Sequence, residues 1–292
     1  MKKIGMIGIG MMGHGIATNL LKHGHTLTML THPGNQPLES LIAQGARLAS
    51  TSKSLAETSE IIILCVTGTP QVEQVLLGGD GVLEGLKSGT VVIDCSTAVP
   101  ASTDRLSTMI IAKGGRFLDA PMTRTPKEAA EGRLNLLVGG DTALFEECRP
   151  VLACFAENIV HAGPIGAGHR MKLLHNFVSL GSVTLMAEAA ACAKAAGIPA
   201  QTFVDVLATG GGWGAPLERL KPYLVNQDTS SMRFSLANSL KDLSYYNQMA
   251  QDIGSDQTVA ASIKKTLEQA CQDEDPNKLL PELVSIIRNR KS

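Results

Sequence analysis

The chain has 292 residues, a mass of 30.8 kDa, and 26 basic against 27 acidic side chains. This nearly balanced charge excludes a broad electrostatic attraction to nucleic acid or to an anionic membrane surface. The length exceeds the size at which one hydrophobic core usually stops growing, so two domains are predicted.

The six cysteines include no C-x-x-C pair, and several stand within apolar runs. This distribution is typical of reduced, packed thiols, so we expect a cytoplasmic location, no disulfide framework and no metal site. The amino terminus lacks a cleavable apolar core, which argues against a signal peptide. No membrane span is expected, because polar residues interrupt the most apolar helical segment at His175, Asn176, Ser179 and Ser182.

A glycine-rich turn follows the first predicted strand, which covers residues 2–8. Its pattern is G-x-G-x-x-G, in which the first glycine permits a tight turn, the second lets the backbone approach a pyrophosphate, and the third allows close helix packing. A helix is predicted over 12–22 and a second strand over 26–30, and this context favours a dinucleotide site over a plain glycine turn. The predicted contacts are Gly8, Gly10, Met11, Met12 and Gly13.

The end of the second strand normally selects the cofactor, through an acidic side chain that binds the ribose 2′-hydroxyl of NAD. Here the strand ends in Thr31 and His32, without an acid. A 2′-phosphate would meet no carboxylate repulsion, and both side chains can donate hydrogen bonds to it. NADP is therefore favoured over NAD, although the absence of an arginine leaves open an enzyme that uses both.

Strand-like runs and helical patterns alternate through the first half of the chain. Alternation of this kind predicts a Rossmann-type, mostly parallel, doubly wound sheet, with ligands bound beyond the carboxyl ends of its strands. We call that edge the rim. The runs cover 61–66, 91–95, 116–120, 134–138 and 159–161, and the helical patterns include 70–77 and 102–113.

Polar or small residues follow three of these strands at the predicted rim. Two of the segments are also compatible with ordinary turn chemistry, and they supply three predicted cofactor contacts: Val66, Thr67 and Thr97. The third segment places an arginine between two threonines, and guanidinium and hydroxyl donors suit an anion. Thr123, Arg124 and Thr125 are therefore the predicted anion-binding residues of the substrate site.

Helical periodicity replaces the strand pattern from residue 163 onward. The first helix would have 28 residues and span about 42 Å, long enough to leave the first domain and form the axis of the second. We predict a dinucleotide domain over 1–163 and an all-helical substrate and oligomerisation domain over 164–292. The apolar surface of the long helix also predicts a homodimer or homotetramer.

Lys172 and Asn176 lie four residues apart in the long helix, so both side chains fall on one stripe. The surrounding positions are apolar, which predicts a helix buried nearly all round with one polar stripe. Taken alone, the segment is more typical of a surface lysine. The predicted dinucleotide sheet immediately before this helix favours a functional amine.

The chain resembles the β-hydroxyacid dehydrogenase family, which contains 3-hydroxyisobutyrate dehydrogenase and tartronate semialdehyde reductase (2-hydroxy-3-oxopropionate reductase). The resemblance runs nearly end to end and implies that Lys172 is the acid/base, that Asn176 holds the substrate, and that Lys241 lies near the cofactor. It rests on Gly8–Gly13, on Asp94–Pro100, on Asp119–Pro121 with Gly139 and Gly140, on Gly166–Gly168 with Lys172 and Asn176, and on Lys241-Asp242-Leu243.

Two departures from the family pattern bear on specificity. Thr123-Arg124-Thr125 stands where most relatives have Ser-Gly-Gly, and this is similar to the sulfolactaldehyde reductases, whose substrate carries a sulfonate. His169-Arg170 extends that likeness. An arginine serves a carboxylate equally well, so the substrate stays open. Thr31-His32 replaces the acid typical of NAD enzymes.

The resemblance implies an oxidoreductase that interconverts a small anionic 3-hydroxyacid, or a hydroxysulfonate, and its aldehyde acid. The Lys172 ammonium would protonate the developing alkoxide in reduction, and its amine would remove the hydroxyl proton in oxidation. A free lysine has a pKa of about 10.4, so desolvation or a nearby cation would have to lower it. The alternatives are an imine reductase, against which a lysine at this position argues, and a non-catalytic dinucleotide-binding protein.

Overall fold

The computed structural model describes residues 1–290 and divides the chain into two compact units. The first unit is Met1–Lys172, and the second begins at Leu173. Each unit has a hydrophobic core of its own. The division falls inside a continuous helix, nine residues after the boundary predicted at residue 163, which stays a prediction.

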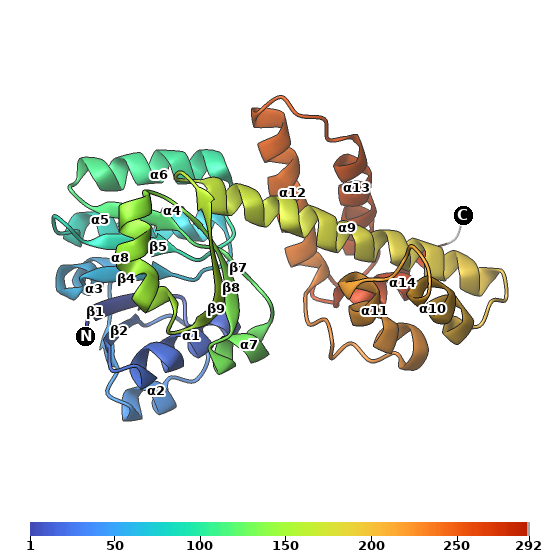
Figure 1. The fold of residues 1–292 in the computed structure, drawn as a ribbon, viewed down its shortest axis with the longest axis horizontal. Coiled ribbons are helices and arrows are strands. Elements are labelled where there is room, and N and C mark those ends of the chain that lie inside the picture. The colour runs from blue at the N-terminus through green and yellow to red at the C-terminus, as the bar shows by residue number, and fades with distance from the viewer. Residues whose placement is uncertain (291–292) are drawn as a thin grey trace. The chain divides into compact units, whose positions relative to one another are not determined.

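Within the described residues, the first unit is built on a nine-stranded sheet in the order β3-β2-β1-β4-β5-β6-β8-β7, with β9 beside β8 (Figure 1). Strands β1 to β6 pair in parallel, whereas β8 runs antiparallel to β6 and β7 and parallel to β9. The predicted Rossmann-type sheet is thus confirmed. Its strands are β1 Lys3–Ile7, β2 Thr26–Leu30, β3 Arg47–Ala49, β4 Ile61–Leu64, β5 Val91–Asp94, β6 Arg116–Asp119, β7 Met122–Thr123, β8 Leu134–Gly139 and β9 Ala156–Gly163.

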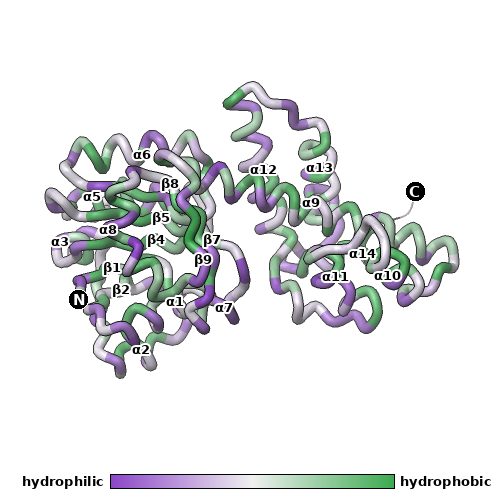
Figure 2. Tube along the Cα trace, viewed as in Figure 1, coloured by the Kyte–Doolittle hydropathy of each residue, from purple (hydrophilic) through white to green (hydrophobic). Residues whose placement is uncertain are grey.

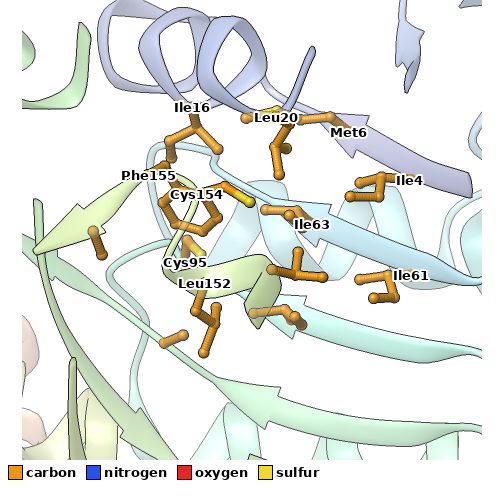
Figure 3. Packing of buried hydrophobic residues seen from close by; sticks show 14 of the residues in the cluster. Ile4, Met6, Ile16, Leu20, Ile61, Ile63, Cys95, Leu152, Cys154 and Phe155 are labelled. Atoms are coloured by element: carbon orange, nitrogen blue, oxygen red, sulfur yellow. The ribbon is translucent and has the colours of Figure 1, made fainter. Parts of the chain in front are cut away.

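The central strands β4 and β5 are buried at every residue and largely hydrophobic along their length (Figure 2), because helices cover both sides of the sheet. In β4, Ile61 and Ile63 point to one face, where Figure 3 shows Ile16 and Leu20 of the first helix. The alternate residues Ile62 and Leu64 belong to the core on the other face. The helices of this unit are α1 Met11–Lys22, α2 Glu39–Ala43, α3 Ser52–Thr58, α4 Thr69–Leu77, α5 Val82–Gly85, α6 Pro100–Ala112, α7 Pro126–Glu131 and α8 Thr142–Leu152.

Several short elements of the first unit carry little sequence signal. Strand β3 has three residues and buries only Ala49, and β7 has two residues. Helix α7 has six residues and depends on a capping box between Thr125 and Glu128. These elements are held by tertiary pairing and caps, since they are too short for hydrophobic periodicity to show.

The regular elements described in the second unit are all helices, as predicted, and one isolated β-bridge joins Ser235 and Leu279. Its helices are α9 Ala167–Ala195, which begins in the first unit, α10 Ala200–Ala208, α11 Ala215–Asn226, α12 Leu236–Asp252, α13 Thr258–Asp273, the 3₁₀ helix η1 Leu280–Glu282 and α14 Leu283–Asn289. Its core packs Leu180, Val183 and Ala187 of α9 against Leu243 of α12 and Leu267 of α13.

The expectation that α9 is buried nearly all round is wrong. Leu174 is 42% exposed and Val178 is 66% exposed, and Met171 and Leu185 extend the same apolar stripe. By length and composition α9 would suffice to cross a membrane, so its polar residues do not make it too polar for a span as expected, and 50% of its most apolar window is buried inside the protein. The expected absence of a membrane span stays a prediction. The exposed stripe supports the predicted homodimer or homotetramer, which stays a prediction.

Candidate active site

The three glycines of the turn before α1 differ in what surrounds them. Gly8 has φ +95°, and a Cβ there would collide with the carbonyl oxygen of Cys65. A Cβ at Gly13 would collide with the carbonyl oxygen of Gly8. At Gly10, by contrast, a Cβ would meet no atom within 4 Å. The first and third glycines are therefore required by the fold, and the second borders open space.

That open space lies at the N-terminus of α1. Gly10 is the N-cap residue, and no side chain caps the first turn, where Met11 is 61% exposed. Main-chain N–H groups in the first turn of a helix lack helical partners, and the helix dipole favours an anion beside them. A dinucleotide pyrophosphate binds where main-chain N–H groups are free and the backbone leaves space beside them. The uncapped N-terminus of α1 and the open Gly10 provide both, so the residues present fit this cofactor.

Asn35 supports the glycine turn from the end of β2. Its Oδ1 accepts a hydrogen bond from the Ile9 N–H at 3.2 Å, and its amide donates to the Leu30 carbonyl oxygen at 2.9 Å. The Gln36 N–H donates to the Ile9 carbonyl oxygen at 2.7 Å. Sequence reasoning missed Asn35, whose only local signal is the Gly-Asn pair after a strand, a common turn pattern.

Thr31 and His32 are exposed at the end of β2. The Gly34 N–H donates to His32 Nδ1 at 3.0 Å, so Nδ1 is the acceptor and the neutral ring carries its hydrogen on Nε2. This leaves an N–H donor on the outer side of the ring. Its contact with a 2′-phosphate stays a prediction.

At the rim, hydrogen bonds connect the segment that follows β4 to the segment that follows β5. The Val66 N–H donates to Ser96 Oγ at 3.0 Å, and the Val99 N–H donates to Thr69 Oγ1 at 2.8 Å. Because β1, β4 and β5 are adjacent parallel strands, the predicted cofactor residues after β4 and β5 lie on the same edge as the glycine turn. Of these, Thr67 is exposed and Thr97 is half-buried.

Three buried titratable residues meet where α9 begins. Asp119, at the end of β6, accepts hydrogen bonds from the Gly166 N–H at 2.7 Å and the His169 N–H at 2.8 Å, so its carboxylate caps the helix. The His169 ring lies 3.9 Å from Asp119 and 3.9 Å from Asp94. Burial raises the pKa of Asp94, against the opposing effect of the His169 ring and of hydrogen bonds from Ser96.

Lys172 lies one turn beyond this cluster, in the last position of the first unit, and is half-buried. Its helix is fixed to the rim by the Asp119 cap and by a hydrogen bond of 3.2 Å between His169 Nε2 and the Ser96 carbonyl oxygen. Ser96 precedes Thr97, a predicted cofactor contact. The first unit therefore brings the predicted acid/base turn to the edge that carries the predicted dinucleotide residues.

The predicted anion loop lies between β7 and α7, and its side chains have partners within the protein. Arg124, at φ +79°, binds Glu157 on β9 and the Arg133 carbonyl oxygen. Its hydrogen bond lowers the pKa of Glu157, which keeps that carboxylate ionised. Glu157 is a partner that sequence reasoning missed, since it lies 33 residues away on a different strand.

The two threonines of this loop have different roles in the structure. Thr125 donates its hydroxyl hydrogen to Glu128 Oε2 at 2.5 Å as part of the α7 cap. Thr123 Oγ1 accepts a hydrogen bond from the Asn135 amide at 3.0 Å, so its own hydroxyl hydrogen can still be donated. Binding of a substrate anion by these residues stays a prediction.

In the second unit, Asn176 is buried and tied to α12. Its Nδ2 donates to Asp242 Oδ2 at 2.6 Å, and its Oδ1 lies 3.0 Å from His175 Nδ1. Asp242 is 2% exposed, and its Oδ1 lies 3.2 Å from Lys241 Nζ without a well-directed hydrogen bond. Asp242 thus orients the Asn176 amide. The expected contacts of Asn176 with substrate and of Lys241 with cofactor stay predictions.

Within residues 1–290, no group of three or more His, Cys, Asp and Glu side chains is arranged to hold a metal ion.

Two family models match the chain. Residues 3–163 match the NAD binding domain of 6-phosphogluconate dehydrogenase, and residues 166–284 match the NAD-binding domain of NADP-dependent 3-hydroxyisobutyrate dehydrogenase.

Curated relatives match over most of the chain. The NAD-dependent L-serine dehydrogenase of Pseudomonas aeruginosa is 32% identical over 257 residues, which cover 86% of each chain. The cytokine-like nuclear factor N-PAC of Xenopus tropicalis is 33% identical over 209 residues, or 72% of this chain. That match spans only 39% of the length of N-PAC.

Solved structures show the same fold. The 3-hydroxyisobutyrate dehydrogenase of Salmonella typhimurium superimposes with a TM-score of 0.85 at 26% identity, covering 98% of this chain and 100% of its own. An imine reductase from Myxococcus stipitatus in complex with NADP⁺ has a TM-score of 0.64 at 22% identity, covering 98% of this chain and 99% of its own. The second likeness extends to the fold alone.

Proposed function

Because the chain belongs to the β-hydroxyacid dehydrogenase family, we propose that it reduces a short anionic aldehyde acid to the hydroxyacid, and catalyses the reverse reaction, with Lys172 as the acid/base. The observation that carries the proposal is the attachment of the Lys172 turn to the rim of a dinucleotide sheet, through Asp119 and His169. The direct test is loss of NADPH absorbance on addition of an aldehyde acid.

A bound nicotinamide cofactor would supply or accept the hydride at its C4 atom. The first turn of α1 would hold its pyrophosphate, with Gly10 allowing the close approach. Lys172 would give a proton to the substrate oxygen during reduction and take it back during oxidation. Asn176, held by Asp242, would orient the substrate, and Thr123 would donate its hydroxyl hydrogen to the anionic end.

NADP is the favoured cofactor, because the exposed residues after β2, Thr31 and His32, offer hydrogen-bond donors and no carboxylate. Thr31→Asp is expected to lower kcat/KM with NADPH by about tenfold or more and to change the value with NADH much less, since a carboxylate would repel the 2′-phosphate. Steady-state kinetics with both cofactors measure this. Thr142→Asp, at another exposed threonine, is the matched control. An unchanged NADPH to NADH ratio in Thr31→Asp contradicts the assignment.

For the substrate, Arg124 is proposed to bind the anionic group after leaving Glu157. An exposed ion pair stabilises a folded structure only weakly, so Glu157→Gln is expected to lower KM for an anionic aldehyde by about two- to fivefold with kcat unchanged. Glu146→Gln, which removes a comparable exposed pair with Arg149, is the control. A KM that stays constant or rises in Glu157→Gln argues against Arg124 as the anion ligand.

Arg124 does not distinguish a substrate carboxylate from a substrate sulfonate, because a guanidinium binds either group. The loop of Thr123, Arg124 and Thr125 supports a hydroxysulfonate such as that made by sulfolactaldehyde reductases as one candidate. The same loop also fits a 3-hydroxyacid. An imine reductase on this scaffold is disfavoured by Lys172, and a non-catalytic dinucleotide-binding protein would not need it.

A further inference from the structure

His169 is a buried residue that transfers neither the proton nor the hydride in the proposed reaction. It is 0% exposed, and its contacts reach three different elements. Its Nδ1 lies 2.8 Å from Thr103 Oγ1 on α6, its Nε2 lies 3.2 Å from the Ser96 carbonyl oxygen after β5, and its N–H donates to Asp119 on β6. One residue of α9 is thus joined to three segments of the sheet domain.

The chemistry of these partners explains why an imidazole fits. A carbonyl oxygen can only accept, so His169 Nε2 must carry a hydrogen. The Thr103 hydroxyl can donate or accept, which lets Nδ1 take part with or without a hydrogen. An aliphatic side chain of similar size would leave the Ser96 carbonyl oxygen without this donor, and the Thr103 hydroxyl would be left with its hydrogen bond of 3.3 Å to the Val99 carbonyl oxygen.

The backbone at the start of α9 packs closely against β8. A Cβ at Gly168 would collide with the Leu137 carbonyl oxygen, and one at Gly139 would lie 2.8 Å from the Gly168 nitrogen. The backbone of the first turn therefore already touches β8. Replacing the ring removes its contacts with Thr103 and Ser96 but keeps the main-chain bonds to Asp119, so the turn stays at the sheet while Lys172, three residues further on, is held less precisely.

We propose that His169 is a positioning residue, which fixes the Lys172 turn of α9 against the Ser96-Thr97 segment of the cofactor edge. The inference rests on the proposed role of Lys172 as acid/base. Displacement of a reacting group by about 1 Å costs on the order of 100-fold in rate, so loss of the His169 contacts lowers kcat strongly without removing a group that touches the substrate.

The test compares His169→Leu with Arg170→Gln, which removes the exposed ion pair between Arg170 and Asp104 from the same turn. His169→Leu is expected to lower kcat on the order of 100-fold, with KM and the Kd for NADPH within about threefold of wild type. Arg170→Gln stays within about twofold of wild type in all three. His169→Gln keeps an N–H donor and recovers at least about tenfold of the loss. If His169→Leu does not fold, His169→Met, which also removes both ring hydrogen bonds, replaces it with the same expected loss and the same criterion.

A second readout needs no turnover. Lysines are dimethylated with ¹³C, and the Lys172 signal is assigned by its loss in Lys172→Arg. This signal moves in His169→Leu and stays in place in Arg170→Gln. An unmoved signal, or a kcat within threefold of wild type in His169→Leu, overturns the proposal. If the wild type reduces no aldehyde acid and the signal still moves, His169 keeps its positioning role and only the proposed function fails.

Discussion

Replacing Lys172 with alanine is expected to lower kcat by about 100- to 10,000-fold, the usual contribution of a general acid/base. The reason is that no other group is proposed to give the alkoxide its proton, so water would have to do so. The Kd for the dinucleotide should change by less than about twofold, because Lys172 is assigned no contact with the pyrophosphate or the ribose. Steady-state kinetics and a fluorescence titration with NADPH measure the two effects separately.

The control for this prediction is Lys194→Ala, which removes an exposed lysine from the last turn of the same helix. It should leave both quantities unchanged. Lys172→Arg keeps the positive charge but holds its proton far too tightly to exchange it, so it should be nearly as slow as alanine. Wild-type turnover in Lys172→Ala would show that the amine has no role in the reaction.

Replacing Gly10 with alanine is expected to weaken dinucleotide binding by at least about tenfold while leaving the fold intact. The methyl group meets no protein atom within 4 Å, and Gly10 has an ordinary negative φ of −77°, so alanine introduces no backbone strain. The new methyl group would occupy the space through which a pyrophosphate approaches the α1 N-terminus. Fluorescence titration gives the Kd, and thermal unfolding checks that Tm is preserved.

Two other glycines provide controls for this result. Gly79→Ala also adds a methyl group to open space, on a segment assigned no ligand, and should alter neither Kd nor Tm. Gly13→Ala forces a collision with the Gly8 carbonyl oxygen and should lower Tm as well as binding. If Gly10→Ala binds NADPH as tightly as wild type does, the pyrophosphate does not lie at this helix end.

The alternating strands and helices of the first unit could be predicted from the sequence. The G-x-G-x-x-G turn between a strand and a helix and the alternation of apolar strands with helices gave the parallel sheet, because these patterns are local. Two-residue β7 and three-residue β3 were missed because their pairing partners, not their own residues, define them.

In the candidate site, too, features that depend on neighbouring residues could be predicted, and contacts between residues far apart in the sequence could not. The spacing of Lys172 and Asn176 shows that they share a helical stripe, but their roles were assigned from the dinucleotide sheet before the helix and from the family resemblance. The partners that position them could not be predicted, since Asp119 lies 50 residues from His169 and Asp242 lies 66 residues from Asn176. Likewise, the charge of Arg124 is visible in the sequence, but its pairing with Glu157 is not. The burial of α9 was overestimated because its composition does not show which apolar residues find a partner.

The most direct test of the proposed function is the rate of NADPH and NADH oxidation with a panel of short aldehyde acids, including sulfolactaldehyde, beside a set of cyclic imines. We expect rapid turnover of at least one anionic aldehyde, with a higher kcat/KM for NADPH than for NADH. Faster reduction of a cyclic imine than of every aldehyde acid, or tight NADPH binding without turnover of any compound, would contradict the proposed function.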